Sequence, residues 1–315
     1  MNQPAILTKN IRDGLVEEEH FGFIVHTDKN KILSTLGDAN SEPFYLRSCA
    51  KPLQASVIVD YELDFNDKEI ALACGSNAGE KIHENIAREL AGKIGIKESD
   101  LKCGTHKPLS PSRQEEMILK GENPNPFQNN CIGKHLTMLA LCKKLGFDIR
   151  DYDNIEHPVQ QIIKNKVNNL CQIETEYPIT KDGCGVPILS MPLENIVPGF
   201  LDMFCDEKYS KIKHSILENP YFFGGETRTD TKIIQETGLI SKVGAGGLCV
   251  VINLEIEEGF IVKISDCDMK AREIVTFEYI KKLGWGNYTP DKSIKTLHNE
   301  TVGEIKTIFD YSPIL

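Results

Sequence analysis

The sequence lacks the paired cysteine spacing of common metal and redox motifs. The chain has 315 residues and ten cysteines, but no CxxC pair occurs among them. This argues against a zinc finger or a thioredoxin-type motif. The N-terminal segment has no basic stretch followed by an apolar core, so we expect no signal peptide. Cysteines in a chain without an export signal are expected to be reduced thiols, which predicts a cytoplasmic protein.

Long apolar runs and an excess of positive charge are also missing. No apolar run approaches the roughly 18 residues that suggest a membrane span. The formal net charge is -10. Such a chain repels nucleic acid and anionic membrane surfaces, so we expect neither as a partner. No repeat, low-complexity segment or Gly/Ser linker divides the sequence, which predicts a single domain over residues 1–315.

Strand patterns lie near both ends of the chain, and helical patterns lie between them. Residues 21–26 and 32–36 are typical of a β-hairpin, and strand patterns return over 240–264. The segment from roughly 65 to 210 is mostly helical in pattern. This order predicts an α+β protein in which both chain ends form an antiparallel sheet, helices pack on it, and a helical subregion is inserted.

The strongest local motif joins Ser48 and Lys51 at a predicted helix start. Positions three apart share one helix face, so the amine can reach the hydroxyl. S-x-x-K is the nucleophile arrangement of penicillin-recognising enzymes and related serine amidases. Lysine acts as the base only if burial or a nearby cation lowers its pKa from ~10.4 toward ~7–8. Taken alone, the pattern also fits an N-cap serine beside a solvated lysine.

Two further segments follow the motif order of the serine β-lactamases. Ser76 lies on a loop of small residues, and Lys242-Val243-Gly244 follows a predicted strand, like the K-T-G edge strand of those enzymes. Taken alone, they also fit a Ser/Asn turn and a bulged strand. Cys131, His135 and Cys184 are possible ligands of a soft metal, but their spacing matches no common zinc pattern, and chemistry alone favours buried structural cysteines.

Together these segments resemble the rhizobial-type L-asparaginases, also called the asparaginase II family. The shared segments occur in family order from near residue 20 to near residue 280. They are Arg47-Ser48-x-x-Lys51, Ala71-Leu72-Ala73-Cys74 with Ser76 and Gly79-Glu80, Asn129-Asn130-Cys131-x-Gly133-Lys134-His135, His157-Pro158-Val159-Gln160, Asp182-Gly183-Cys184-x-x-Pro187, Lys242-x-Gly244-Ala245 and Val262-Lys263-x-x-Asp266.

The resemblance implies hydrolysis of L-asparagine to L-aspartate and ammonia, a fold similar to serine β-lactamases and serine glutaminases, and a homodimer. It implies two Ser–Lys pairs, which are Ser48 with Lys51 and Ser76 with Lys263. We favour Ser48 as the nucleophile, because backbone N–H groups and the dipole at a helix start help an oxyanion. Ser76 with Lys263 stays open as the nucleophilic pair or as a proton relay.

The resemblance also implies a zinc ion and a set of pocket residues. Zinc would be held by Cys131, Lys134 and Cys184 and would modulate substrate binding; no organic cofactor is expected. The implied pocket residues are Arg47, His135, Asp182 and Cys249. Among these, Arg47 is the candidate partner of the substrate's α-carboxylate, and Asp182 is the candidate partner of its α-ammonium.

Four positions depart from the family pattern. Asn77 and Ala78 replace a common His and Ser, Ile132 replaces a common Ser, and Gly246 replaces a common Glu. Other functions stay open. The alternatives are a glutaminase, a β-lactamase-like or penicillin-binding serine hydrolase, and a catalytically weak amino-acid-binding protein.

Overall fold

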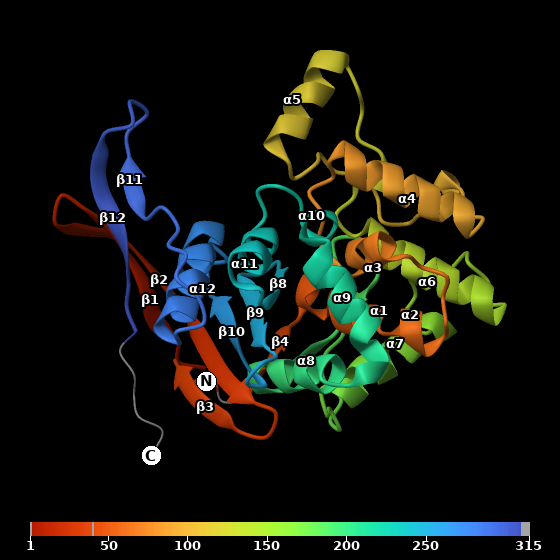
Figure 1. Cartoon of the computed structure of the whole chain (residues 1–315), viewed down its shortest axis with the longest axis horizontal. Helices are drawn as coiled ribbons and strands as arrows, with labels where there is room; N and C mark the ends of the chain where they lie inside the picture. Colours follow the sequence, from red (N-terminus) through yellow and green to blue (C-terminus); the bar gives the residue numbers. More distant parts are fainter. Residues whose placement is uncertain (1, 40, 310–315) are drawn as a thin grey trace.

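An eight-stranded sheet forms the left half of the molecule in Figure 1. The computed structural model describes residues 2–39 and 41–309. In this sheet, neighbouring strands follow the order β11-β12-β1-β2-β10-β9-β8, and β3 also pairs with β2. All these pairings are antiparallel. The strands are β1 (Ala5–Arg12), β2 (Leu15–Asp28), β3 (Ile32–Leu36), β8 (Ile240–Gly244), β9 (Leu248–Asn253), β10 (Glu258–Ile264), β11 (Ser293–Lys295) and β12 (Thr301–Thr307).

Helices fill most of the chain between β3 and β8. They are α1 (Lys51–Ala55), α2 (Val57–Asp60), α3 (Asp67–Cys74), α4 (Lys81–Lys93), α5 (Pro111–Lys120), α6 (Ile132–Leu145), α7 (Pro158–Leu170), α8 (Ile196–Phe204), α9 (Ser210–Glu218), α10 (Pro220–Phe223) and α11 (Thr229–Thr237), and α12 (Met269–Lys282) follows β10. Short 3-10 helices are η1 (Arg47–Ala50), η2 (Glu98–Asp100), η3 (Pro126–Gln128), η4 (Leu193–Asn195) and η5 (Glu207–Tyr209). Two small ladders pair β4 (Pro43–Tyr45) with β7 (Ser190–Pro192) and β5 (Thr180–Lys181) with β6 (Pro187–Ile188).

The α+β class, with an antiparallel sheet built from both chain ends, is confirmed. The sequence did not reveal β1 or the first half of β2, because β1 is mostly half-buried, the first half of β2 is mostly exposed, and neither carries clear apolar alternation. The helices also continue past residue 210, through α9, α10 and α11. Within the described ranges, none of the helices combines the length and apolar character needed to cross a membrane.

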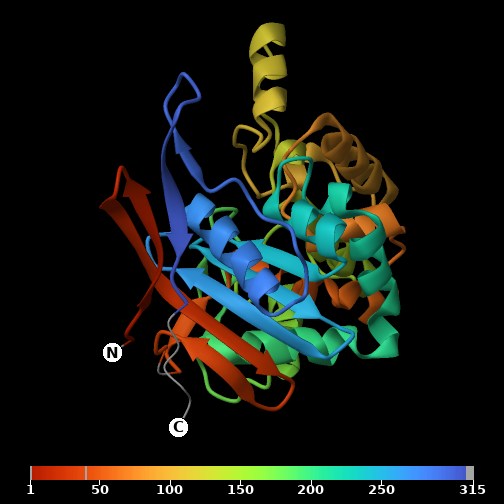
Figure 2. The same cartoon turned by 60° about the vertical axis from the view of Figure 1, so that its left-hand side comes forward.

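Alternating side chains bury both faces of the central strands. On β2 and β10, Ile24 and Val262 face a core shared with α12, whereas Val25 and Ile261 face the core of the helical lobe. Figure 2 shows α12 lying across one face of the sheet. Because successive strand residues point to opposite faces, this alternation places α12 on one side and the helical lobe on the other.

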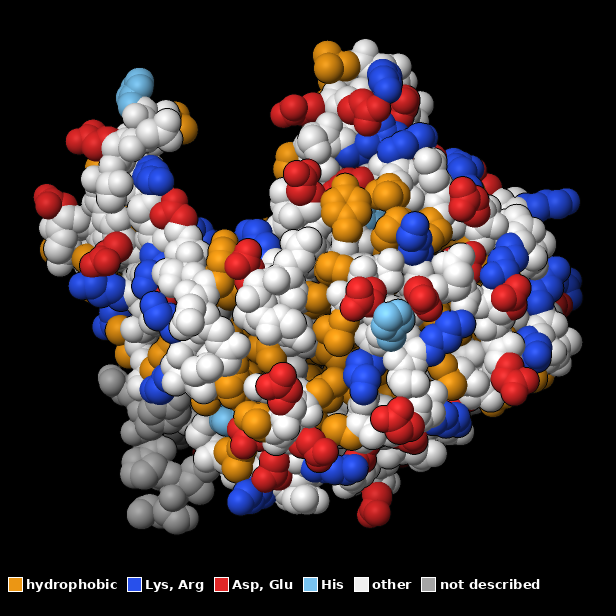
Figure 3. Space-filling model, viewed as in Figure 1, with side chains coloured by type: hydrophobic (Ala, Val, Ile, Leu, Met, Phe, Trp, Pro, Cys, Tyr) orange, Lys and Arg blue, Asp and Glu red, His pale blue; other side chains and the backbone are white. Residues whose placement is uncertain are grey.

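Two arms extend from the body of the molecule. One arm is formed by β11 and β12, and the other carries α5 (Figure 1). Figure 3 shows a wide notch in the molecular surface between them.

Helices α3 and α6 approach one another closely through a glycine. A Cβ added at Gly133 would lie 2.1 Å from the carbonyl oxygen of Leu72 on α3. Only a residue without a side chain fits there, so Gly133 sets the distance between the loops that precede α6 and follow α3.

We therefore expect Gly133→Ala to lower the free energy of unfolding by about 1–3 kcal/mol, because backbone atoms must move to admit the methyl group. Gly92→Ala in α4 is the matched control, since nothing lies within 4 Å of a Cβ there. The control should raise stability by about 0.5–1 kcal/mol, as alanine favours a helix. Urea denaturation of both variants measures the difference, and equal stability would contradict the packing.

Candidate active site

Ser48 lies at the junction of the sheet and the helical lobe. It is the second residue of η1, which continues directly into α1, and its residue exposure is 8%. The preceding residue, Arg47, has a φ of 49°, which is uncommon for a residue with a side chain. Backbone strain of this kind concentrates at functional sites. The hydroxyl of Ser48 makes no hydrogen bond to another described residue and lines an open cleft.

Lys51 is fully buried below that cleft. Its ammonium donates hydrogen bonds to the carbonyl oxygen of Gly75 at 2.9 Å, to Oγ of Ser76 at 2.9 Å and to the carbonyl oxygen of Asn130 at 2.7 Å. Burial lowers the pKa of Lys51 to about 8, and the charges of Lys134 and Lys242 lower it as well. A lysine with this pKa can exchange a proton near neutral pH.

The pairing of serines with lysines differs from the one that the sequence suggested. The ammonium of Lys51 donates a hydrogen bond to Oγ of Ser76, and its side-chain partners in the described chain do not include Oγ of Ser48. The ammonium of Lys263 donates to the carbonyl oxygen of Ile264 at 2.8 Å, and no hydrogen bond joins it to Ser76 within the described chain. Lys263 is half-buried on β10, and burial lowers its pKa. Motif spacing does not specify which side chains meet across elements, and the hydrogen bond seen at Ser76 comes from Lys51. The pair of Ser76 with Lys263 stays a prediction.

The cleft that contains Ser48 and Ser76 has a volume of about 300 Å³. It is lined by Ser48, Ser76, Leu109, Asn130, Arg228, Val243, Gly244, Ala245, Gly246, Gly247, Cys267, Met269 and Arg272. Both Gly246 and Gly247 have positive φ, at 79° and 77°. A turn without side chains lets a ligand approach the backbone closely. None of the described lining residues is an Asp or Glu.

The lysine of the K-x-G segment lies below the cleft wall. Lys242 is fully buried and forms an ion pair with Asp230 of α11 at 3.0 Å. Asp230 also accepts hydrogen bonds from the backbone N–H of Val243 at 2.7 Å and from Oγ of Ser241 at 3.2 Å. This carboxylate therefore fixes β8, the strand that supplies Val243 and Gly244 to the cleft.

A second cluster lies next to Lys51 and can hold a metal ion. Ligand atoms of Cys131, Asp182 and Cys184 all lie within 4.8 Å of one another. Lys134 donates to Asp182 at 3.0 Å. Burial would lower the pKa of Lys134, but the charges of Cys131, Cys184 and Asp182 raise it above its usual range. Two sulfurs with one oxygen or nitrogen suit zinc. A protonated Lys134 has no lone pair, which makes Asp182 the readier third ligand.

The two predicted substrate-binding residues Arg47 and Asp182 contact each other. Nε of Arg47 lies 3.0 Å from Oδ1 of Asp182. Burial opposes ionisation of Asp182, but the charges of Lys134 and Arg47 lower its pKa to about 2. Both oxygens of this carboxylate therefore already have a cationic partner.

His135 and Cys249 lie outside the cleft lining. Nδ1 of His135 is 2.7 Å from the hydroxyl of Tyr152, and its buried Nε2 has no hydrogen-bond partner. Burial lowers the pKa of His135 well below its usual value. Cys249 belongs to the core shared with α12, and burial raises its pKa to about 11. Its neighbour Leu248 faces the helical lobe instead. Strand alternation thus turns Cys249 away from the expected pocket.

Three polar residues of the cleft were missed by the sequence analysis. They are Asn130, Arg228 and Arg272. Asn130 precedes α6, and its Oδ1 lies 3.2 Å from Nε2 of His106. The two arginines belong to no motif. They line the same cleft as the serines only because α11 and α12 pack beside it.

A family model described as L-asparaginase II matches residues 8–307, and the chain belongs to this family. Membership supports a hydrolase of the amidohydrolase type that acts on a small molecule.

Among solved structures, the chain is similar to a β-lactamase from Mycobacterium bovis, with 10% identity and a TM-score of 0.37 over 83% of this chain and 94% of that one. It is also similar to a putative β-lactamase from Bacteroides dorei, with 13% identity and a TM-score of 0.45 over 83% and 92%. A search of curated proteins found no match.

We expect Lys242→Met to lower the free energy of unfolding by about 3–5 kcal/mol, because it leaves the carboxylate of Asp230 buried without its cation. The control is Lys295→Met, which removes an ion pair whose side chains are 43% and 66% exposed. Such surface pairs contribute about 0–1 kcal/mol. Thermal and urea denaturation measure both, and a Lys242 variant as stable as the control would refute the anchoring role of Asp230.

Proposed function

We propose that this protein is an L-asparagine amidohydrolase that uses serine and lysine. The observation that carries the proposal is the position of Lys51. It is a fully buried amine with a pKa of about 8, it contacts Ser76, and both serines line one cleft. Family membership supports the choice of a side-chain amide as the substrate.

In the proposed acylation step, Oγ of Ser48 attacks the amide carbon and neutral Lys51 accepts the hydroxyl proton. The backbone N–H groups at the start of η1 stabilise the oxyanion. Ser76, which is hydrogen-bonded to Lys51, passes the proton to the amide nitrogen. The C–N bond then breaks, ammonia leaves, and an aspartyl ester on Ser48 remains. Water cleaves this ester by the reverse proton transfers and releases L-aspartate.

Ser76 is a second candidate for the nucleophile. The observation in its favour is direct, because Lys51 donates its hydrogen bond to Ser76 and none to Ser48. In that version Ser48 takes the part of the proton relay. The same lysine remains the base in both versions.

We also propose that zinc is bound by Cys131 and Cys184, with Asp182 or a deprotonated Lys134 as a further ligand. Zinc at this place would neutralise thiolate charge and fix the segment from Asn130 to Lys134, whose first carbonyl holds Lys51. It would thereby influence substrate binding without touching the reacting amide. From the family resemblance we further propose a homodimer, which light scattering of the purified protein tests. The ten cysteines and the absence of an export signal in the sequence support a cytoplasmic location.

Purified protein should release ammonia from L-asparagine, and Ser48→Ala should lower kcat by roughly 10³-fold or more, because the acceptor of the aspartyl group is lost. Ser99→Ala, which changes an exposed serine of η2, should retain full activity. L-glutamine and the chromogenic lactam nitrocefin are assayed in parallel. Faster turnover of glutamine or of nitrocefin would favour the glutaminase or the β-lactamase alternative, and ligand-induced thermal stabilisation without ammonia release would favour the binding protein.

The pH profile of kcat/KM should report the titration of Lys51. Below its pKa the lysine is an ammonium and accepts no proton, so the rate should rise with pH and level off above about 8. Lys51→Met should abolish the rise in kcat/KM with pH, together with most of the activity. A profile that stays flat from about pH 6 to 10 would exclude Lys51 as the base.

Mass spectrometry of metals should detect zinc in the purified protein, and Cys184→Ser should lose it, because a hydroxyl is a poor zinc ligand. Cys205→Ser is the control, since Cys205 is exposed and lies outside the cluster. The variant without zinc should show a raised KM for L-asparagine with a smaller change in kcat. Equal zinc content in both variants would remove Cys184 from the ligand set.

A further inference from the structure

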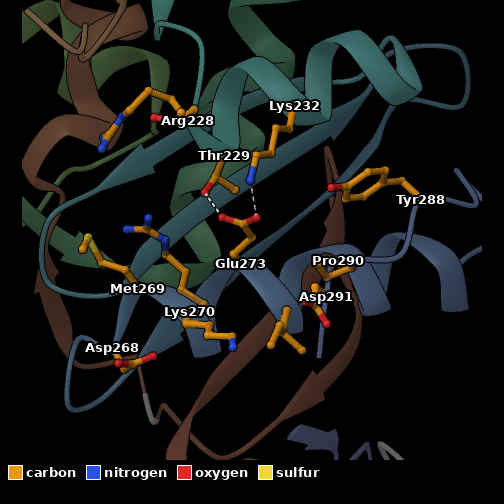
Figure 4. Close-up of a pocket in the computed structure, with 13 residues that line it drawn as sticks. Arg228, Thr229, Lys232, Asp268, Met269, Lys270, Glu273, Tyr288, Pro290 and Asp291 are labelled. Carbon is orange, nitrogen blue, oxygen red and sulfur yellow. Dashed lines mark hydrogen bonds and ion pairs between the residues drawn. The ribbon is translucent and has the colours of Figure 1, made fainter. Parts of the chain in front are cut away.

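We propose that Arg228 and Arg272 form the site that binds the substrate's α-carboxylate. This inference rests on the proposed function and assigns a specificity role that the motifs do not reveal. Arg228 directly precedes α11, and Arg272 lies in the first turn of α12. Both line the cleft of Ser48 and Ser76. Both also line the neighbouring pocket of about 580 Å³ that is drawn in Figure 4.

Neither guanidinium is fully satisfied by the residues that the structure describes. The guanidinium of Arg228 makes no hydrogen bond or ion pair with any of them, and its Nε is buried without a partner. Arg272 is only 6% exposed. One of its terminal nitrogens donates to the carbonyl oxygen of Gly244 at 3.3 Å, and its buried Nε has no partner. Arg228 is half-buried and Arg272 is buried. A cation shielded from water without a partner is costly, so a bound anion would stabilise this pair.

The carboxylates near Arg228 are already occupied. Asp230 holds Lys242 at 3.0 Å. Glu273 accepts from Lys232 at 2.8 Å and from the hydroxyl of Thr229 at 2.9 Å. Figure 4 shows Lys232 and Thr229 pointing at Glu273, while the side chain of Arg228 extends away from it. Burial lowers the pKa of Arg228. The charge of Asp230 raises this pKa, and the charge of Arg272 lowers it. The two guanidiniums therefore repel each other, and the two carboxylates that act on Arg228, Asp230 and Glu273, already have other partners.

The charge of the cleft agrees with an anionic ligand. Its described lining contains two arginines and no carboxylate. Arg47, which the sequence suggested for this role, is instead paired with Asp182 at 3.0 Å. The planar guanidinium forms paired hydrogen bonds with a carboxylate, so Arg228 and Arg272 can both bind and orient an amino acid whose side-chain amide reaches Ser48.

The test compares L-asparagine with L-asparaginamide, in which an amide replaces the α-carboxylate. The product of side-chain hydrolysis is identified by chromatography. For the unmodified protein we expect kcat/KM for L-asparagine to exceed kcat/KM for L-asparaginamide by roughly 100-fold or more. Arg228→Gln and Arg272→Gln should each raise KM for L-asparagine, change kcat less, and leave kcat/KM for L-asparaginamide within about threefold. The ratio of kcat/KM for L-asparagine to kcat/KM for L-asparaginamide should therefore fall strongly in both variants.

The matched control is Lys270→Gln, which removes a cation that lines only the neighbouring pocket and should retain the preference. Because Arg228 has no partner, its variant should melt at the same or a higher temperature, so it reports on binding even if the Arg272 variant fails to fold. Persistence of the preference in Arg228→Gln, or its collapse in Arg47→Gln alone, would overturn the assignment. An unmodified protein that releases no ammonia from L-asparagine would instead refute the proposed function.

Discussion

The ammonium of Lys51 donates to three acceptors, and these acceptors come from two segments that are distant from it in the sequence. Gly75 and Ser76 follow α3, and Asn130 precedes α6. A buried cation is tolerated only when its donors are satisfied. The position of Lys51 therefore fixes both segments relative to α1, and the close contact of Gly133 with α3 holds them at that distance.

The lysine and the proposed metal site share one structural support. The segment that offers the carbonyl of Asn130 continues into Cys131 and Lys134 at the start of α6. The charges of these two residues act on Lys51 in opposite directions, since Cys131 raises its pKa and Lys134 lowers it. A change in the charge of the cluster therefore changes the proton affinity of the proposed base without any movement of the chain.

Local patterns in the sequence predicted the antiparallel sheet, both serines and Lys51, because alternation and short motifs encode these features directly. The partners of the lysines could not be predicted, because spacing defines a helix face and not the side chain opposite it. Cys249 stays a predicted pocket residue, and the register of β9, which the motifs do not reveal, places it in the core shared with α12. Arg228 and Arg272 carry no local signal, as they meet the serines only through the packing of α11 and α12.

One serine beside Lys51 is proposed to carry the aspartyl group during turnover. Acid-quenched reaction with L-asparagine, followed by proteolysis and mass spectrometry of the peptides, tests this most directly. We expect an aspartyl adduct on the peptide that contains Ser48, and its loss in Ser48→Ala. An adduct on Ser76 would reverse the roles of the two serines. Rapid ammonia release with no adduct on either serine in a rapid-quench time course would contradict covalent catalysis by this site.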